Sequence, residues 1–396
     1  MHRLVRWLGG LLLLIVIAAV VAWLALRPGA PDAFYTWAPA MPAEPGVLLR
    51  QESFERGLPA GARGWRILYT TTAAQGTAAL ASAIVMLARD APPGPRPVVA
   101  WTHGTTGAVP GCGPSLLDEP FANVPGLAGL VERGWLLVAT DYAGLATPGP
   151  HPYLIGEGEA RSALDALRAA RSMREVQMGE RTVVWGHSQG GHAAMWTGIV
   201  APTYAPDVSI AGVAAAAPAS DLRALIGAIQ HTVVGRIMTS YVMYAYAATY
   251  SDVRWDDYVT SPSARWAARD MASRCLAGSQ AIVSVIEALA LGGPIFSTVP
   301  TSGAFGARLA QNTPDRTVPQ PLLIAQGETD DLVLPEVQTR WVARRCAAGQ
   351  AIDYRRYAGR DHLTLVASDS PFDADLLRWT EDRFADRPVQ VACPNP

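Results

Sequence analysis

The residues with the clearest chemical potential surround one serine. Residues 186–190 read Gly-His-Ser-Gln-Gly, which is a Gly-x-Ser-x-Gly motif centred on Ser188. A short apolar run at 182–185 precedes the motif, and a helical pattern begins at His192. A strand, a sharp turn and a helix in this order lift a serine hydroxyl above a sheet, and the strained turn requires small residues around the serine. We therefore predict that Ser188 is a nucleophile, although a glycine-rich chain can match the motif by chance.

A serine nucleophile needs a general base, and histidine is the usual one. The chain contains 7 His, and beyond the motif and His192 at the start of the following helix only His231 and His362 follow Ser188. Hydrolases with this type of turn place the nucleophile, the acid and the histidine in that chain order. His231 precedes the candidate acids, so we predict His362 as the base. The alternative is that His362 is an ordinary histidine in a surface loop.

The acid that orients the histidine is expected after a late strand. Three carboxylates, Glu328, Asp330 and Asp331, follow the apolar run at 321–325. Their task would be to hold the imidazole in one tautomer and to stabilise its charged form. The spacing from Gly327 and the apolar pair that follows favour Asp330. Asp331 remains the alternative, with Glu328 behind it.

A tetrahedral oxyanion needs preorganised N–H donors. We predict that one is the N–H of Gln189, directly after the nucleophile, and that the other is the N–H of Thr105 in the loop after an earlier strand. The neighbours Gly104 and Thr106 are small enough to let the backbone approach a substrate, and we expect both to line the pocket. Tyr142 lies after the next strand, and we predict it as a further pocket residue. Both loops could also be purely structural turns.

The composition excludes several classes of protein. The chain has 396 residues, of which 50% are hydrophobic and 17% are charged, and its net charge is −2. This balance excludes a disordered chain and lacks the basic footprint of a nucleic-acid partner. All 32 basic residues are arginine, so lysine-based catalysis is excluded. No clustered metal ligands or cofactor motifs occur, so we predict neither a metal nor a cofactor.

The elements that must position these residues alternate between strands and helices. Such alternation predicts a mostly parallel sheet with helices on both faces. We predict an α/β-hydrolase fold whose eight strands lie near 65–71, 81–87, 97–101, 135–140, 182–185, 208–216, 321–325 and 352–357. The alternation stops after the sixth strand. We therefore divide the chain into a core at 34–220 and 319–396 and an inserted helical cap at 221–318.

The first residues are apolar enough to target the chain to a membrane. Residues 7–26 carry no charge, and twenty helical residues span ~30 Å, the thickness of a bilayer core. We favour an uncleaved anchor within 1–33 over a cleaved signal peptide, because no convincing cleavage site follows. Both alternatives export the remainder, so we predict an extracytoplasmic protein that is either membrane-anchored or secreted. Residues 28–62 are rich in Pro and Gly and indicate a linker and an N-terminal arm.

Four cysteines agree with export. An even number of cysteines in an exported chain suggests two disulfides, with three possible connectivities. Cys346 and Cys393 lie within the last fifty or so residues and would staple the tail, which leaves Cys112 to pair with Cys275. The alternative is that the cysteines are buried free thiols.

With these motifs in place, the chain resembles the secretory lipases, an α/β-hydrolase family that includes the yeast lipase A type and bacterial relatives. The matching segments are 103–107, 141–145, 147–153, 186–192 and 326–330, and the resemblance extends over nearly all of residues 60–390. The resemblance implies a triad of Ser188, Asp330 and His362, a helical cap over the site, and two disulfides in the pairing given above. The retained N-terminal segment and the neighbouring Asp331 depart from the family pattern.

From the residues and the resemblance we predict a serine carboxylester hydrolase, with acylglycerols or other apolar esters as substrates. A short-chain esterase, an acyltransferase or a polyester hydrolase would use the same triad. A more remote alternative is an inactive, membrane-anchored binding module. We take a monomer as the default.

Overall fold

Apolar segments from the whole chain meet in one sheet. The computed structural model describes residues 2–91 and 93–394. The strands are β1 (Leu48–Phe54), β2 (Ala62–Thr72), β3 (Ala78–Ala88), β4 (Arg96–Thr102), β5 (Leu136–Thr140), β6 (Met178–His187), β7 (Ser209–Ala216), β8 (Leu322–Gly327) and β9 (Ile352–Tyr357). Their order is β1-β2-β3-β5-β4-β6-β7-β8-β9, and pairing is parallel from β5 onward.

The predicted eight-stranded sheet is wrong by one strand, because within the described residues the sheet has nine. The additional strand is β1, which lies in the segment interpreted as linker and arm. It pairs antiparallel with β2 at the edge of the sheet. An edge strand needs few apolar residues, and the Arg50–Ser53 stretch of β1 is polar, so the usual signal of a buried strand is absent. The other eight strands lie where the sequence predicts them.

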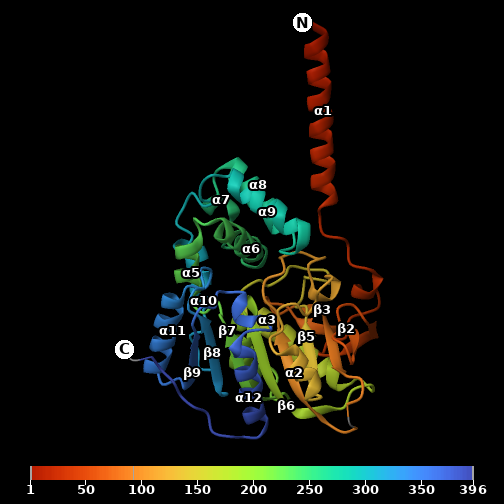
Figure 1. Cartoon of the computed structure of the whole chain (residues 1–396), viewed down its shortest axis with the longest axis vertical. Helices are drawn as coiled ribbons and strands as arrows, with labels where there is room; N and C mark the ends of the chain where they lie inside the picture. The colour runs from red at the N-terminus through yellow and green to blue at the C-terminus, as the bar shows by residue number, and fades with distance from the viewer. Residues whose placement is uncertain (1, 92, 395–396) are drawn as a thin grey trace.

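Helices cover both faces of the sheet (Figure 1). Alternate side chains of β4 separate the two cores, with Val98 on one face and Val99 on the other. Helices α3, α4 and α11 pack against the face of Val98, and α2 and α12 pack against the face of Val99. Their bounds are α2 (Leu127–Glu132), α3 (Gly156–Arg171), α4 (Gln189–Tyr204), α11 (Pro335–Ala347) and α12 (Pro371–Phe384).

The segment between β7 and β8 is helical and lies above one end of the sheet (Figure 1). Its helices are α5 (Leu222–Ile229), α6 (Val233–Thr249), α7 (Trp255–Tyr258), α8 (Pro262–Ala272), α9 (Gly278–Ala290) and α10 (Gly303–Gln311). Buried residues of these helices, among them Leu222 and Tyr241, belong to the same apolar cluster as Ala216 at the end of β7. The cap therefore packs directly onto the core.

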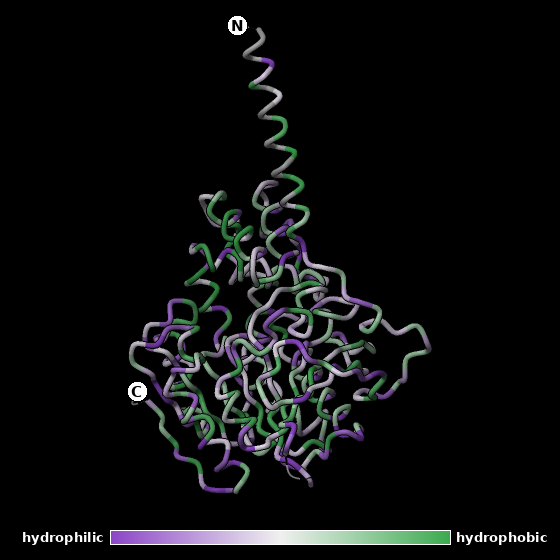
Figure 2. The backbone as a smooth tube through the Cα atoms, turned by 45° about the vertical axis from the view of Figure 1, so that its right-hand side comes forward, coloured by the Kyte–Doolittle hydropathy of each residue, from purple (hydrophilic) through white to green (hydrophobic). Residues whose placement is uncertain are grey.

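Helix α1 (His2–Ala25) projects away from the body, and most of its residues are hydrophobic (Figures 1 and 2). In the part of the chain that the structure describes, no helix has the length and apolar character needed to cross a membrane.

Both disulfides have the predicted pairing. Cys112 is bonded to Cys275, which joins the loop after β4 to the cap between α8 and α9. Cys346 is bonded to Cys393, which joins the end of α11 to the C-terminal tail. The alternative of buried free thiols is excluded for these four residues.

Candidate active site

The turn between β6 and α4 holds Ser188 in a strained conformation. Its backbone has φ +58° and ψ −120°, a region that residues other than glycine rarely adopt. A Cβ at Gly186 would lie 2.0 Å from the carbonyl oxygen of Gly190, and one at Gly190 would lie 1.9 Å from that of Thr102. The close approach of these backbones explains the glycines of the motif. Ser188 thus lies on the sharp strand-to-helix turn that the sequence predicts.

Asp330 and His362 meet after β8 and β9. The Nδ1 atom of His362 lies 2.8 Å from Oδ2 of Asp330. The other carboxylate oxygen of Asp330 accepts hydrogen bonds from the backbone N–H groups of Leu332 (2.9 Å) and Val333 (2.8 Å). Asp330 is buried, so its orientation is fixed by these donors. A carboxylate held in this way favours the His362 tautomer with its proton on Nδ1.

The competing residues are exposed, whereas Asp330 and His362 are buried. Asp331 is exposed, whereas the carboxylate of Asp330 contacts His362. Glu328 is also exposed and lies 3.2 Å from Arg356 in an ion pair. His231 is exposed between α5 and α6. The geometry therefore groups Asp330 with His362.

A second histidine, His187, contacts the backbone and the ring of His362. His187 is buried, and its Nε2 lies 2.9 Å from the backbone carbonyl oxygen of His362, with the two ring centroids 4.7 Å apart. Burial lowers the pKa of His187 to about 3. His187 is therefore neutral, and its Nε2–H donates to that carbonyl. No local sequence pattern could indicate this contact, because the two histidines are 175 residues apart in the chain.

The predicted oxyanion donors belong to residues close to Ser188. Gln189 is the first residue of α4, so its N–H has no partner within the helix and lies at the positive end of the helix dipole. Thr105 lines the same cavities as Ser188, and its hydroxyl lies 2.8 Å from that of Tyr153. Gly104 also lines the cavity that holds Ser188 and His362.

The other two predicted pocket residues differ in where they lie. Tyr142 is fully buried, and its hydroxyl donates to the backbone carbonyl of His103 at 3.1 Å. Its φ of +58° turns the chain so that the ring packs behind the loop of Thr105 instead of facing a substrate. Thr106 lines a cavity of about 670 Å³ that adjoins the cavity of Ser188 and His362, because Gly104, Thr105, Asn123 and Leu276 line both. The structure therefore contradicts the pocket role predicted for Tyr142, and that of Thr106 stays a prediction.

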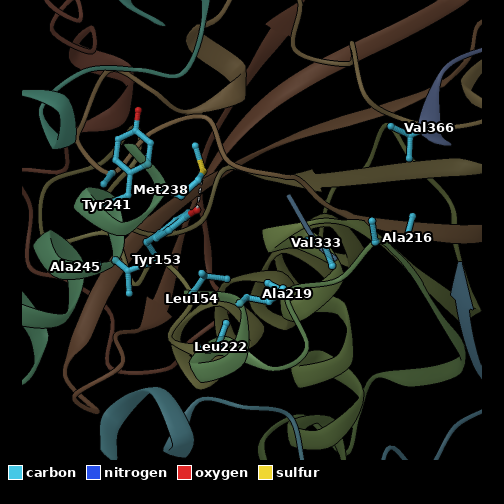
Figure 3. Packing of buried hydrophobic residues seen from close by; sticks show 14 of the residues in the cluster. Tyr153, Leu154, Ala216, Ala219, Leu222, Met238, Tyr241, Ala245, Val333 and Val366 are labelled. Atoms are coloured by element: carbon cyan, nitrogen blue, oxygen red, sulfur yellow. Dashed lines mark hydrogen bonds between the residues drawn. The ribbon is translucent and has the colours of Figure 1, made fainter. Parts of the chain in front are cut away.

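Two cavities meet at Ser188. An apolar cavity of about 50 Å³ extends from Ser188 between α5 and α6, past residues such as Leu225, Ile226 and Val242. A larger cavity of about 420 Å³ contains Ser188, His362 and Leu363. Met238 of α6 lines both cavities and therefore stands at their junction. Figure 3 shows Met238 facing the Tyr153 hydroxyl, with Leu154, Ala219 and Leu222 nearby; the sulfur lies 3.7 Å from that hydroxyl.

Within residues 2–91 and 93–394, no group of three or more His, Cys, Asp or Glu side chains is arranged to hold a metal ion.

A serine on a strand-to-helix turn, a buried Asp–His pair beyond the following strands and a helical cap together define an α/β-hydrolase. A model of the secretory lipase family matches residues 122–391, and the chain belongs to this family.

Curated relatives agree with this assignment. The chain is 23% identical to lipase A of Arthroderma benhamiae over 397 aligned residues, which cover 92% of this chain and 82% of the relative. It is also 23% identical to the secreted triacylglycerol lipase LIP3 of Malassezia globosa, over 75% of this chain and 68% of the relative.

Solved structures show the same fold. Candida antarctica lipase A superposes with a TM-score of 0.71 at 18% identity, over 91% of this chain and 87% of that structure. The rice cell wall degrading esterase LipA of Xanthomonas oryzae superposes with a TM-score of 0.67 at 21% identity, over 87% of this chain and 99% of that structure. The protein is a carboxylic ester hydrolase of the lipase type, and the family and the two disulfides agree with an extracytoplasmic location.

Proposed function

We propose that Ser188, His362 and Asp330 hydrolyse apolar acyl esters through an acyl-enzyme. The Ser188 hydroxyl attacks the ester carbonyl while Nε2 of His362 takes its proton. His362 then gives this proton to the departing alcohol, and Asp330 stabilises the imidazolium from the Nδ1 side. A water molecule, activated by the same His362, attacks the acyl-enzyme and releases the acid. Atoms balance: one ester and one water give one acid and one alcohol.

The N–H groups of Gln189 and Thr105 stabilise the oxyanion in both steps. Donors of this kind are commonly worth ~3 kcal/mol each, because they point at charge that develops only in the transition state. Their position on a helix N-terminus and on a loop tied by the Cys112–Cys275 disulfide keeps them preorganised.

The two cavities suit different parts of an ester substrate. We assign the acyl chain to the apolar cavity between α5 and α6, and the alcohol to the larger cavity beside His362 and Leu363. At ~10–15 Å³ for each water-sized group, a cavity of about 50 Å³ accepts roughly three to five such groups. Short acyl chains therefore fit directly, and long chains require α6 side chains such as Met238 to move. This supports a short-chain esterase as the second candidate beside a lipase of acylglycerols.

The observation that carries the proposal is the buried Asp330–His362 hydrogen bond of 2.8 Å beside a cavity that also contains Ser188 on its strained turn. The test is hydrolysis of p-nitrophenyl esters of two to sixteen carbons by the wild-type chain and by Ser188→Ala. A matched control is Ser220→Ala, because Ser220 is also buried but its hydroxyl lies 3.0 Å from Gln338. We expect loss of activity only in Ser188→Ala, and equal activity of both variants would refute the proposal. The optimal chain length distinguishes lipase from esterase.

Attachment of the protein to a membrane through residues 1–33 stays a prediction from the sequence. Fractionation of cells that produce the full chain tests it.

A further inference from the structure

A buried carboxylate that the proposed mechanism does not use lies behind the oxyanion site. Glu159 of α3 is completely buried. Its Oε1 accepts hydrogen bonds from Nε2 of Gln189 (2.7 Å) and from the backbone N–H of Leu154 (3.0 Å). Its Oε2 lies 3.1 Å from Nδ1 of His192. Burial of a carboxylic acid is costly unless hydrogen bonds satisfy it, as these three do, and one of the three partners, Gln189, carries a proposed oxyanion donor.

The hydrogen bonds show that this acid adds no net charge to the site. Nε2 of His192 lies 2.8 Å from the backbone carbonyl of Asn312, and a carbonyl only accepts, so Nε2 carries a proton. Nδ1 of His192 then either donates to a Glu159 carboxylate or accepts from a protonated Glu159. In both cases Glu159 and His192 are neutral as a pair. Burial raises the pKa of Glu159, in agreement with a shared proton. A neutral pair does not oppose an oxyanion nearby.

The side chain of Gln189 has one allowed orientation. Its Nε2 donates to Glu159 and also lies 3.1 Å from Nε2 of His151. Burial lowers the pKa of His151 to about 3, so this ring is neutral. Nδ1 of His151 donates to the carbonyl of Ala143 at 3.2 Å, which leaves its Nε2 as the acceptor that Gln189 requires. Because both amide protons are used, the first residue of α4 is held in place.

The same network reaches the second donor. The ring of His151 stacks on Tyr142, with centroids 5.7 Å apart, and the Tyr142 hydroxyl donates to the carbonyl of His103, two residues before Thr105. On the other side, the Glu159 carboxylate holds the N–H of Leu154, whose φ is +53°. Leu154 follows Tyr153, whose hydroxyl contacts that of Thr105. Glu159 is thus connected to both sides of the oxyanion site.

We propose that Glu159 is a positioning residue that holds the N–H donors of Gln189 and Thr105 in the arrangement that binds the oxyanion. This inference rests on the oxyanion roles proposed above. Glu159 does not touch the substrate, and its effect passes through Gln189 and Leu154. A shift of ~1 Å in a catalytic group can reduce the rate by about 10²-fold, so loss of this carboxylate is expected to be visible in kcat.

Two substitutions separate positioning from charge. Glu159→Ala removes the acceptor for Gln189 and Leu154. Glu159→Gln preserves the shape: its amide oxygen accepts from Gln189 and Leu154, and its amide nitrogen donates to a neutral His192. The matched control is Asp165→Asn on the same helix. Asp165 is also buried, but it contacts Thr71, Tyr204 and Arg168, which lie outside the proposed site.

The assay compares a p-nitrophenyl ester with its thiono analogue, in which sulfur replaces the carbonyl oxygen. Donors that are placed for oxygen favour the oxygen ester, so the ratio of the two kcat values reports on their placement. For Glu159→Ala we expect kcat for the oxygen ester to fall by about 10²-fold with a nearly constant KM, and the ratio to fall by about tenfold. Glu159→Gln should retain most of the rate and the ratio. Asp165→Asn should lower the melting temperature and leave the ratio unchanged.

The inference is wrong if folded Glu159→Ala keeps the wild-type ratio, or if Glu159→Gln loses as much as Glu159→Ala. If Glu159→Ala does not fold, Gln189→Met decides the matter, because it keeps the backbone N–H but removes the amide that Glu159 holds. An unchanged ratio in Gln189→Met would equally overturn the inference. Ser188→Ala is assayed in parallel, so that failure of the serine mechanism is recognised separately.

Discussion

Asp330→Asn changes one hydrogen-bonding atom and should inactivate the protein. Oδ1 of Asp330 accepts two backbone N–H groups, from Leu332 and Val333. An amide nitrogen cannot replace this oxygen without facing two donors, so the asparagine must place its nitrogen at the Oδ2 position. That position faces Nδ1 of His362 at 2.8 Å and also Nε2 of Gln326 at 3.3 Å. The substitution therefore makes a donor face His362.

The expected loss follows from the tautomer of His362. With a donor opposite it, Nδ1 of His362 must accept, so the ring proton moves to Nε2. A protonated Nε2 cannot take the proton of Ser188. Where this tautomer change has been isolated in serine hydrolases, kcat falls by about 10⁴-fold, which at 1.36 kcal/mol per decade is roughly 5.5 kcal/mol. The fold should persist, because both backbone donors keep their acceptor.

The assay is steady-state hydrolysis of p-nitrophenyl butyrate, with circular dichroism to check folding. The matched control is Asp331→Asn, because Asp331 is exposed and the Asp330 carboxylate already holds His362. Asp331 also lines the cavity that contains Ser188 and His362, so we expect Asp331→Asn to change activity by less than about tenfold, far less than Asp330→Asn. A folded Asp330→Asn variant within tenfold of wild type would refute this reasoning, and so would an equal loss in Asp331→Asn.

Three further predictions concern the cap, the disulfide and pH. Met238→Ala should raise kcat/KM for esters of eight or more carbons relative to butyrate, because Met238 stands at the junction of the two cavities; an unchanged chain-length profile would contradict this role. Replacing Cys112 and Cys275 together by Ala should lower the free energy of unfolding by about 2–5 kcal/mol, measured by urea denaturation, and a loss below measurement error would count against it. Burial lowers the pKa of His187 to about 3, so the unfolded chain takes up a proton there below its ordinary value of 6.5 and the native chain does not. The free energy of unfolding should therefore fall as pH drops from 6.5 toward 3, by up to ~1.4 kcal/mol per pH unit from this residue, and His187→Gln should flatten the slope by that amount.

The sequence was most informative where local chemistry decides structure. Most of the eight predicted strands were predictable because buried strands need continuous apolar runs, and the turn at Ser188 was predictable because only small residues fit beside it. The edge strand β9 was predicted from alternating residues, whereas the edge strand β1 was missed because its Arg50–Ser53 stretch is polar and it lies in a Pro- and Gly-rich segment. The disulfides were predictable from the position of Cys346 and Cys393 near the end of the chain.

Residues whose importance depends on distant contacts were not predictable. Glu159 resembles any helical acid in sequence, and only the fold brings it to Gln189, thirty residues away along the chain. Tyr142 follows a strand end as a pocket residue would, but its backbone conformation turns the ring inward. A polar residue at a spacing that should face the core, as Glu159 has among Ala160, Ala163 and Leu164, is the signal that could have identified it.

The most direct test of the proposed mechanism is detection of the acyl-enzyme. The full chain is mixed with p-nitrophenyl butyrate and quenched in acid within the first turnover. The protein is then digested, and the mass of the peptide that contains Ser188 is measured by mass spectrometry. The mechanism predicts a butyryl group on Ser188 in the wild-type chain, which accumulates to a steady level and disappears when the ester is consumed, and none in Ser188→Ala. Hydrolysis at the wild-type rate by Ser188→Ala, or a butyryl group on a different residue that turns over at the same rate, would contradict it.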